Sequence, residues 1–441
     1  MDALRFLAAL AVVAFHLTGI NPGWEGRAPA ETDTLGRWAA YGAMGVPLFF
    51  VISGFVVLMT AWGRDVPHFV ASRIGRLFPA YWVAVGIAAV FAFVLWPAGS
   101  VSEGVAPTKG DALVNLTMLQ GAFGVRDLDG AFWTLWTEAR FYVLVAVLVV
   151  VGITRRRVLA FAALWPLAGA MAQQAGQPLV ATVLIADYSP YFAGGMLLYL
   201  LHRCGHDLLT WLLVGMQALF ALHFALGYYP VALTRATGWA TSGTLVAVVS
   251  TACFGLVALV TLTRVNRVGA RWMTTLGALT YPLYLVHEKL GYFVIHLLAG
   301  RTSAWLVLAA ALAAPLALAV LVHRAVERPL GLRLRTAVLT ALRRDEAPEP
   351  TRAPAVAGPA VPAPAEAVAV AVATGETPLT TSARRPVTHP VPMHAGSRST
   401  AQFPAVHRSP STRGPAATGP VGRPAVPTTS SSARHSAVLD S

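Results

Sequence analysis

The chain has 441 residues, of which 56% are hydrophobic and only 12% charged, and its mean hydropathy is +0.60. Soluble globular domains are about 25% charged, so this composition excludes an ordinary soluble domain. Recurring apolar runs of about twenty residues predict an all-α polytopic membrane protein. The net charge of +13 does not indicate nucleic-acid binding. Most arginines lie in short connections and near the C-terminus, where membrane topology and lipid head groups explain them.

The first predicted span, MDALRFLAALAVVAFHL, carries Arg5 near its start and His16 near its end. At about 100° and about 1.5 Å per residue, eleven residues return to nearly the same helical face about 16 Å further along. Arg5 and His16 are therefore predicted to lie on one stripe. A signal peptide is the alternative, but Asp2 and the interrupting His16 argue against it. For His16 the simpler alternative is a histidine hydrogen-bonded in a helix interface.

Ten membrane-spanning helices are predicted along the chain. Their approximate ranges are 4–20, 41–60, 79–96, 132–153, 158–175, 179–201, 209–227, 241–262, 276–299 and 304–323. With the N-terminus inside, sixteen Lys or Arg fall on the cytoplasmic side and six on the other. The positive-inside rule then predicts that both termini are cytoplasmic. The longest external connection, 96–131, carries more acids than bases.

Three regions are predicted from the change in composition: a transmembrane domain at 1–331, a basic juxtamembrane segment at 332–346 and a tail at 347–441. The last span is expected to leave its helix at residues 327–329, just before a proline. The tail is rich in Pro, Ala, Ser and Thr and has no apolar periodicity. Such a segment buries too little surface to offset its chain entropy. We expect it to be disordered and cytoplasmic, with no second globular domain.

Ionisable side chains within the spans are candidate functional residues, because each is costly in hydrocarbon unless it faces a cavity or a partner. Arg73 and Arg76 are three residues apart at the cytoplasmic start of the third span. They suit a paired clamp on donor phosphates, with lipid head-group anchoring as the alternative. Glu138 lies in the outer half of the fourth span and is expected to face a polar cavity.

Two other spans carry polar residues at helical spacing. In the second span, GVPLFFVISGFVVL, small residues including Ser53 allow close helix approach. The ninth span places Tyr281, Tyr284 and His287 three residues apart on one face. The remaining ionisable residues of note are Glu288 and Lys289, expected to pair with neighbours, and the weaker candidates Asp187 and His223.

Six motifs occur in order over about residues 1–331: the Arg and His of the first span, FFVISGF, RIGRLFPAYW, FWTLWTE, YPLYLVH and VERP. This ordered set resembles the acyltransferase-3 family of integral-membrane acyltransferases. The resemblance implies transfer of an acyl group, usually acetyl from acetyl-CoA, to hydroxyls of surface glycans, lipid-linked sugars or secondary metabolites. It implies roles for six residues: His16 with Arg5 in catalysis, Arg73 and Arg76 in donor binding, and contributions from Glu138 and His287.

One departure from the family concerns the start of the chain. Asp2 follows the initiator directly, whereas the family's first motif usually has several residues before it, often including a basic one. Either the start lies further upstream or the inner end of the first helix is short.

The resemblance and the helix geometry together predict a mechanism. A cytoplasmic acyl-CoA is held with its phosphates near Arg73 and Arg76 and its arm extended between Arg5 and His16. His16 acts as general base on an acceptor hydroxyl, or carries the acyl group itself. The residues expected to line the substrate cavity are Ser53, Tyr281, Tyr284 and His287. The expected partners are an acyl-CoA, a saccharide or glycosylated acceptor and the bilayer of a bacterial cytoplasmic membrane, without a metal.

Two rival functions use the same features. A transporter or flippase for a lipid-linked saccharide would also need intramembrane His, Arg and Glu. The sequence shows neither repeated halves nor a matched pair of broken helices, which transporters commonly have. A membrane sensor that signals through the tail is supported only by the presence of the tail.

Overall fold

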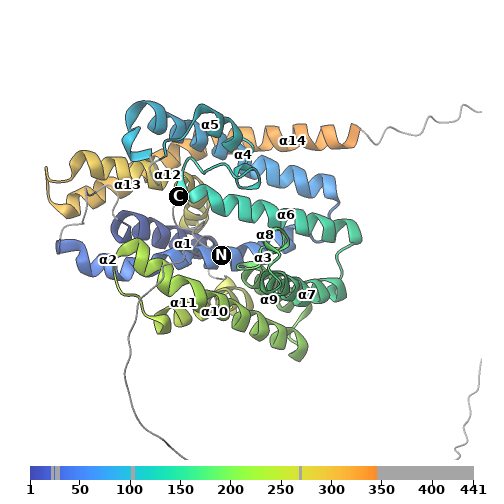
Figure 1. The fold of residues 1–441 in the computed structure, drawn as a ribbon. Coiled ribbons are helices and arrows are strands. Elements are labelled where there is room, and N and C mark those ends of the chain that lie inside the picture. Colours follow the sequence, from blue (N-terminus) through green and yellow to red (C-terminus); the bar gives the residue numbers. More distant parts are fainter. Residues whose placement is uncertain (21–23, 25–29, 101–104, 268–270, 345–441) are drawn as a thin grey trace, which may run out of the picture. The chain divides into compact units, whose positions relative to one another are not determined.

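The computed structural model describes residues 1–20, 24, 30–100, 105–267 and 271–344, and this part of the chain contains helices and no β-strand. Figure 1 shows how the helices are arranged. They are α1 (Asp2–Ala14), α2 (Asp33–Ala39), α3 (Gly45–Ala61), α4 (Val66–Val90), α5 (Lys109–Asn115), α6 (Trp133–Val151), α7 (Arg155–Gln174), α8 (Pro178–Val183), α9 (Ser189–Cys204), α10 (Leu208–Thr237), α11 (Gly243–Leu262), α12 (Arg271–Leu298), α13 (Ala304–Val322) and α14 (Arg328–Arg344). The predicted tail, 347–441, lies outside the described residues.

Each of the ten predicted spans overlaps one of these helices. Within the described ranges, seven helical segments are long and apolar enough to cross a membrane. This confirms an α-helical, multi-pass membrane protein. Among the other helices, α9 has only 16 residues and α12 carries a charged pair, Glu288 and Lys289, within its length. The count of ten and the cytoplasmic side of both termini stay predictions.

Two span boundaries differ clearly from the prediction. The third helix begins at Val66 rather than near residue 79, because the Asp65 side chain caps it by accepting a hydrogen bond from the His68 N–H at 2.9 Å. Arg73 and Arg76 therefore lie inside this helix rather than at its start. The sixth span begins at Ser189 rather than near residue 179, because the short α8 and a turn precede it.

The end of the last span also differs from the prediction. Residues 327–329 do not end the helix: the chain passes through a π-helical turn, His323–Glu327, and continues as α14. Pro329 falls in the first turn of α14, where a missing N–H costs little. α14 lies close to α4, since a Cβ on Gly75 would come within 2.7 Å of the Gly331 carbonyl oxygen. The predicted basic segment is thus largely helical as far as Arg344.

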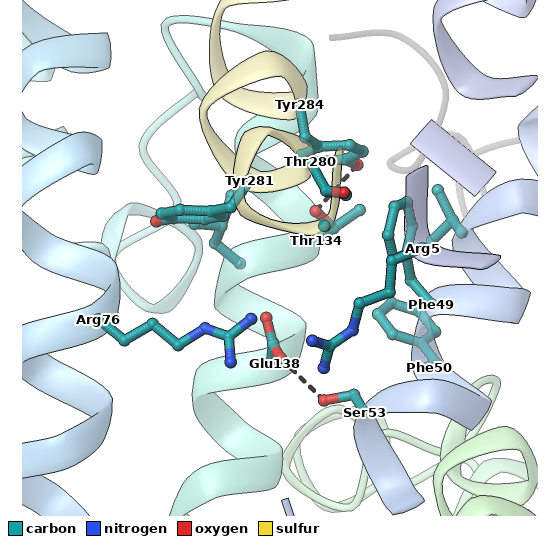
Figure 2. Close-up of a pocket in the computed structure, with 13 residues that line it drawn as sticks. Arg5, Phe49, Phe50, Ser53, Arg76, Thr134, Glu138, Thr280, Tyr281 and Tyr284 are labelled. Atoms are coloured by element: carbon teal, nitrogen blue, oxygen red, sulfur yellow. Dashed lines mark hydrogen bonds between the residues drawn. The ribbon is translucent and has the colours of Figure 1, made fainter. Parts of the chain in front are cut away.

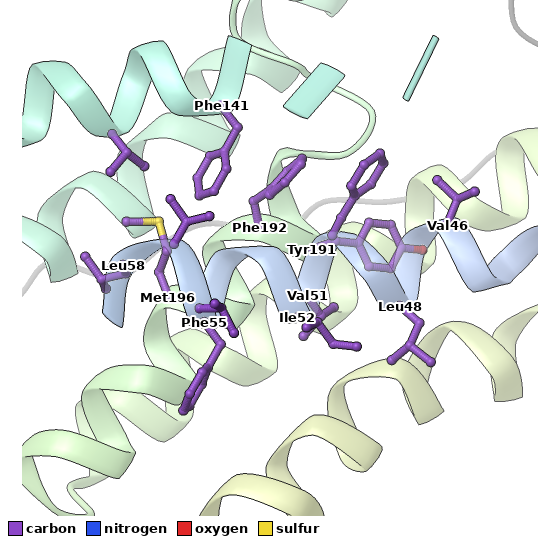
Figure 3. Close-up of a cluster of buried hydrophobic side chains, with 14 of the residues drawn as sticks. Val46, Leu48, Val51, Ile52, Phe55, Leu58, Phe141, Tyr191, Phe192 and Met196 are labelled. Atoms are coloured by element: carbon purple, nitrogen blue, oxygen red, sulfur yellow. The ribbon is translucent and has the colours of Figure 1, made fainter. Parts of the chain in front are cut away.

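The centre of the hydrophobic core is α3, which lies against α9. A Cβ on Gly54 would overlap the Phe192 carbonyl, and one on Gly195 would overlap the Val51 carbonyl. The predicted close approach through small residues is therefore confirmed at Gly54. Figure 3 shows Phe192 and Phe141 side by side over α3, with ring centroids 4.3 Å apart. This packing holds α6 and α9 in place against α3.

α1 is held between α3 and α12 by three other glycines. A Cβ on Gly45 would lie 2.5 Å from the Ala8 carbonyl oxygen, one on Gly277 would lie 2.4 Å or more from several atoms of Asp2, and one on Gly291 would lie 2.5 Å from the Leu17 side chain. The backbones of α1 and α12 therefore approach each other at both ends of α1. This brings the end of α1 that carries His16 against the middle of α12.

The connection 96–131, which is predicted to be external, folds back onto the helices. Its helix α5 is capped reciprocally by Thr108 and Asp111. The buried Asn115 donates to the carbonyls of Asp111 and Arg126 and accepts from the Leu128 N–H. Together these bonds fix the segment that leads into α6.

Candidate active site

His16 and His287 form a buried pair where α1 meets α12. The end of α1 widens into a π-helical turn, Phe15–Gly19, which contains His16. π-helical turns often occur at functional sites. His16 Nδ1 lies 3.0 Å from His287 Nε2, and the ring centroids are 4.9 Å apart. His287 is completely buried, and the His16 side chain is 15% exposed.

The hydrogen-bond partners assign the tautomers of this pair. His287 Nδ1 lies 2.8 Å from the Tyr284 carbonyl oxygen, which can only accept, so this nitrogen carries the proton. His287 Nε2 is then an acceptor for the Nδ1–H of His16, which also faces the Val12 carbonyl at 3.0 Å. The remaining nitrogen, His16 Nε2, keeps its lone pair. An imidazole in this state can accept a proton from a hydroxyl.

Two carboxyl groups lie near His16. Glu288 Oε2 is 3.8 Å from His16 Nε2 and has no hydrogen-bond partner among the described residues. Asp129, from the external connection, accepts from the N–H groups of Ala131 and Lys289 at 3.0 and 3.4 Å and is hydrogen-bonded to the Glu288 carboxyl. The Glu288 carboxyl is thereby held beside His16 Nε2. Burial raises the pKa of Asp129.

An inner cavity with about 710 Å³ of empty space lies between α1, α3, α4, α6 and α12. Its polar lining consists of Arg5, Ser53, Arg76, Thr134, Glu138, Thr280, Tyr281 and Tyr284. Figure 2 shows Arg5 and Arg76 pointing toward one another from opposite sides, with Glu138 between them. Two guanidinium groups and one carboxylate leave an excess of positive charge. The inner cavity is therefore suited to an anionic ligand.

The Glu138 carboxylate is oriented by its neighbours. Ser53 Oγ and the Tyr142 hydroxyl both donate to its Oε1, at 2.8 and 2.6 Å. The second carboxylate oxygen is left for the cavity. Ser53 thus acts through Glu138 as well as lining the cavity, a contact that the sequence did not predict.

Arg73 does not line the inner cavity. Its Nη2 donates to Thr60 Oγ1 at 3.2 Å, and its guanidinium lies over the Tyr142 ring, 5.6 Å from the centroid. Three residues along a helix differ by about 60° in direction, and here that difference separates a buried Arg73 from an exposed Arg76. Within the described residues Arg76 faces Arg5 across the cavity, in place of the predicted pairing with Arg73.

The predicted face of α12 is divided between the two sites. Tyr281 and Tyr284 line the inner cavity, whereas His287 holds His16. The Tyr281 hydroxyl donates to the Leu77 carbonyl at 3.0 Å, and the Tyr284 hydroxyl lies 3.0 Å from Thr134 Oγ1. These bonds fix both rings against the neighbouring helices.

A smaller cavity, which we call the histidine cavity, contains His16 and has about 420 Å³ of empty space. Val46 and Tyr284 line both this cavity and the inner cavity. Arg5 and His16 therefore lie along adjoining spaces, as their predicted stripe implied.

Sequence reasoning missed several members of the site. Tyr142 lies four residues after Glu138, and that spacing alone could have identified it as a partner. Glu288 was noted only as an ionisable neighbour of His287. Asp129 gave no signal, because nothing in an acidic connection shows where it folds back.

Within the described residues no three His, Cys, Asp or Glu side chains gather as a metal site.

Comparison with known proteins identifies the family of the chain. A family model described as an acyltransferase domain matches residues 1–324. The peptidoglycan O-acetyltransferase OatA of Listeria monocytogenes is 26% identical over 163 residues, 33% of this chain and 23% of OatA. The acyltransferase MdmB of Streptomyces mycarofaciens is 31% identical over 150 residues, 32% of this chain and 36% of MdmB.

A shorter match, 40% identical over 57 residues, links 12% of the chain to 18% of the exopolysaccharide production protein ExoZ of Rhizobium meliloti. In none of these three relatives does the match cover more than 36% of the relative's length. No solved structure is significantly similar to the chain. The match over residues 1–324 nevertheless takes in every cavity-lining group described above, and the chain therefore belongs to the acyltransferase-3 family of membrane proteins.

Proposed function

We propose that this protein transfers an acyl group, acetyl from acetyl-CoA, to the hydroxyl of a saccharide or glycosylated acceptor at the cell envelope. The observation that carries the proposal is the position of the buried His16–His287 pair beside a positively charged cavity. The printed names of OatA and MdmB, an O-acetyltransferase and an acyltransferase, support the same class of reaction.

The donor binds in the inner cavity. Its phosphates are attracted by Arg76 and Arg5, which present two guanidinium groups to the same space. Arg73 stabilises this arrangement from behind, through the ring of Tyr142 and hence Glu138. The rise along α1 from Arg5 to His16 is about 16 Å, a distance that an extended pantetheine arm covers. The thioester then lies near Tyr284, between the two cavities.

His16 acts as general base. Its Nε2 removes the proton from the acceptor hydroxyl as the oxygen attacks the thioester carbonyl carbon. The C–S bond breaks, the new C–O ester bond remains on the acceptor, and the proton passes from His16 to the departing thiolate. While His16 is protonated, the Glu288 carboxyl, 3.8 Å from its Nε2, stabilises the imidazolium. No proton or electron is gained or lost overall.

The test is acyl transfer from labelled acetyl-CoA in membranes that contain the wild-type protein or His16→Ala. We expect labelled ester in the wild-type membranes only, at equal protein abundance. A transporter or flippase would move a saccharide without consuming acetyl-CoA. Absence of acetyl-CoA-dependent label in well-inserted wild-type protein, with several acceptors supplied, would reject the proposal.

A further inference from the structure

A third cavity lies on the other side of His16. This outer cavity has about 1390 Å³ of empty space and is formed by α7, the turn before α9, and α10. Its polar lining includes Gln173, Asp187, Tyr188, His223, Tyr228 and Tyr229. Asp187 and His223 stand out in the sequence, yet neither has a role in the reaction described above.

The outer cavity exists because α7 and α10 separate. The two helices are joined near their starts by an ion pair of 2.8 Å between Arg155 and Asp207. They are joined again where Gln217 Nε2 donates to the Ala162 carbonyl at 2.8 Å. Eleven residues beyond that contact on each helix are Gln173 and Tyr228, which line the cavity instead of closing it. The opening thus lies at the predicted outer end of both helices.

The outer cavity adjoins the histidine cavity. Tyr188, Tyr228 and Tyr229 line both spaces, and the histidine cavity also contains His16. The three cavities therefore form a series, with the arginines at one end, His16 in the middle and the outer cavity at the other end. A molecule in the outer cavity reaches His16 from the side opposite the donor.

The chemistry of the outer cavity differs from that of the inner one. Its described lining contains an amide, a carboxylate, an imidazole and phenols, and neither Lys nor Arg. Gln173 Nε2 donates to Asp187 Oδ1 at 2.9 Å, which orients the exposed carboxylate. Such groups accept hydrogen bonds from hydroxyls, and the tyrosine rings offer flat faces. Arg140 interacts with Asp187 and Tyr188 but does not line the cavity, so an anionic ligand would meet the carboxylate before this cation.

We propose that the outer cavity is the acceptor site and that it takes an uncharged, polyhydroxylated ring. This proposal rests on the proposed acyl transfer and adds the place and charge of its acceptor. One ring hydroxyl passes the three tyrosines to His16, gives up its proton there and becomes the ester oxygen, while the donor sulfur leaves as the thiol. The ring is either free or carried by a lipid of the outer leaflet.

A steric test uses two glycines of α10. A Cβ on Gly227 or on Gly215 would meet nothing within 4 Å, but only Gly227 lines the outer cavity. With labelled acetyl-CoA and octyl β-glucoside, we expect Gly227→Trp to lower transfer at least tenfold and Gly215→Trp to leave it unchanged. Both variants should reach wild-type abundance in the membrane. Equal transfer by the two variants would overturn the assignment.

A charge test gives an independent result that does not depend on how Gly227→Trp folds. Asp187 is exposed, so Asp187→Lys reverses its charge without opening the core. We expect wild-type protein to prefer octyl β-glucoside to octyl β-glucuronide, and Asp187→Lys to shift that ratio at least fivefold toward the glucuronide. An unchanged ratio would overturn the proposed charge selection. Methyl β-glucoside lacks the octyl chain, so its use as an acceptor would indicate a free ring rather than a lipid-borne one.

A wrong acceptor site and a wrong reaction would give different results. If wild-type protein neither hydrolyses acetyl-CoA nor acylates any of these glucosides, acyl transfer itself is wrong. If wild-type protein transfers acetyl groups but both variants behave like wild type, only the acceptor site is wrong.

Discussion

The inner and outer cavities flank the same histidine but are built from opposite chemistry. The inner cavity presents Arg5 and Arg76, with a carboxylate fixed between them by Ser53 and Tyr142. The described lining of the outer cavity has tyrosines, a glutamine and a carboxylate but no Lys or Arg. One end is suited to an anion and the other to a neutral polar ring. If the proposals hold, charge keeps the two substrates apart before either reaches His16.

The same contrast explains which lining residues can be singled out from a sequence. A guanidinium or carboxylate within a span has a large desolvation cost, so its presence already points to a cavity or a partner. Tyrosines near the end of a span are ordinary, because aromatic residues also favour membrane interfaces. Glu138 could therefore be singled out from the sequence, whereas Tyr188 and Tyr228 could not.

The largest effect is expected where the two cavities meet. His16→Gln keeps much of the side-chain volume but cannot accept the hydroxyl proton, and general-base catalysis contributes about 10²–10⁴-fold. We expect acetyl transfer to fall by that factor while donor and acceptor still bind. Transfer rates in membranes, normalised to protein abundance, measure the loss. A wild-type rate at normal abundance would make His16 a packing residue.

The next largest effect separates the two arginines of α4. Arg76→Ala removes a guanidinium from the inner cavity and should raise the KM for acetyl-CoA at least tenfold, since a charge-assisted contact contributes about 1.5–3 kcal/mol. Arg73→Ala is the matched variant, because Arg73 is buried against Thr60 and Tyr142. It should reduce protein abundance or thermal stability more than donor affinity. Equal donor affinity in wild type and Arg76→Ala would indicate that Arg76 binds lipid head groups and not the donor phosphates.

The sequence predicted the helices of this protein better than their ends. Long apolar runs predicted ten spans, and each of them overlaps a helix, because burial in lipid requires such runs. This prediction missed the start of α4, where a capping Asp65 extends the helix into a polar segment. It also missed the continuation into α14, because a proline after a π-helical turn does not stop the helix.

The candidate site shows a similar limit. Arg5, Ser53, Arg76, Glu138, Tyr281 and Tyr284 come together in the inner cavity, and His16 meets His287. The sequence predicted one cavity for Ser53, Tyr281 and Tyr284, but it did not predict the contact between the two histidines. Contacts between distant segments were not accessible. Asp129 reaches Lys289 and Glu288 only because Asn115 fixes the external connection against the helices. The roles of all these residues stay predictions until they are tested.

A smaller effect is expected at Ser53, which acts on the donor cavity through Glu138. Ser53→Ala removes one of two donors to Glu138 Oε1 while Tyr142 remains. One net hydrogen bond contributes about 1 kcal/mol, which corresponds to roughly fivefold in KM for acetyl-CoA. Acceptor KM should not change, because Ser53 lines the inner cavity and not the outer one. Tyr142→Phe should give a similar result, and a purely structural Ser53 would leave both constants unaltered.

The smallest expected effect lies in the connection 96–131, where a lower pH should stabilise the fold. Burial raises the pKa of Asp127 to about 6 from its ordinary 3.8, although Gln120 donates to its carboxylate. The folded form therefore binds this proton more tightly than the unfolded form, and stability decreases as the pH rises from about 4 to about 6. Hydrogen-exchange protection factors for residues 105–131 should be several-fold higher at pH 4.5 than at pH 7. Asp127→Asn should flatten this difference without abolishing it, because burial raises the pKa of Asp129 in the same direction. Protection that rises with pH in the wild type would show that Asp127 is stabilised as the carboxylate.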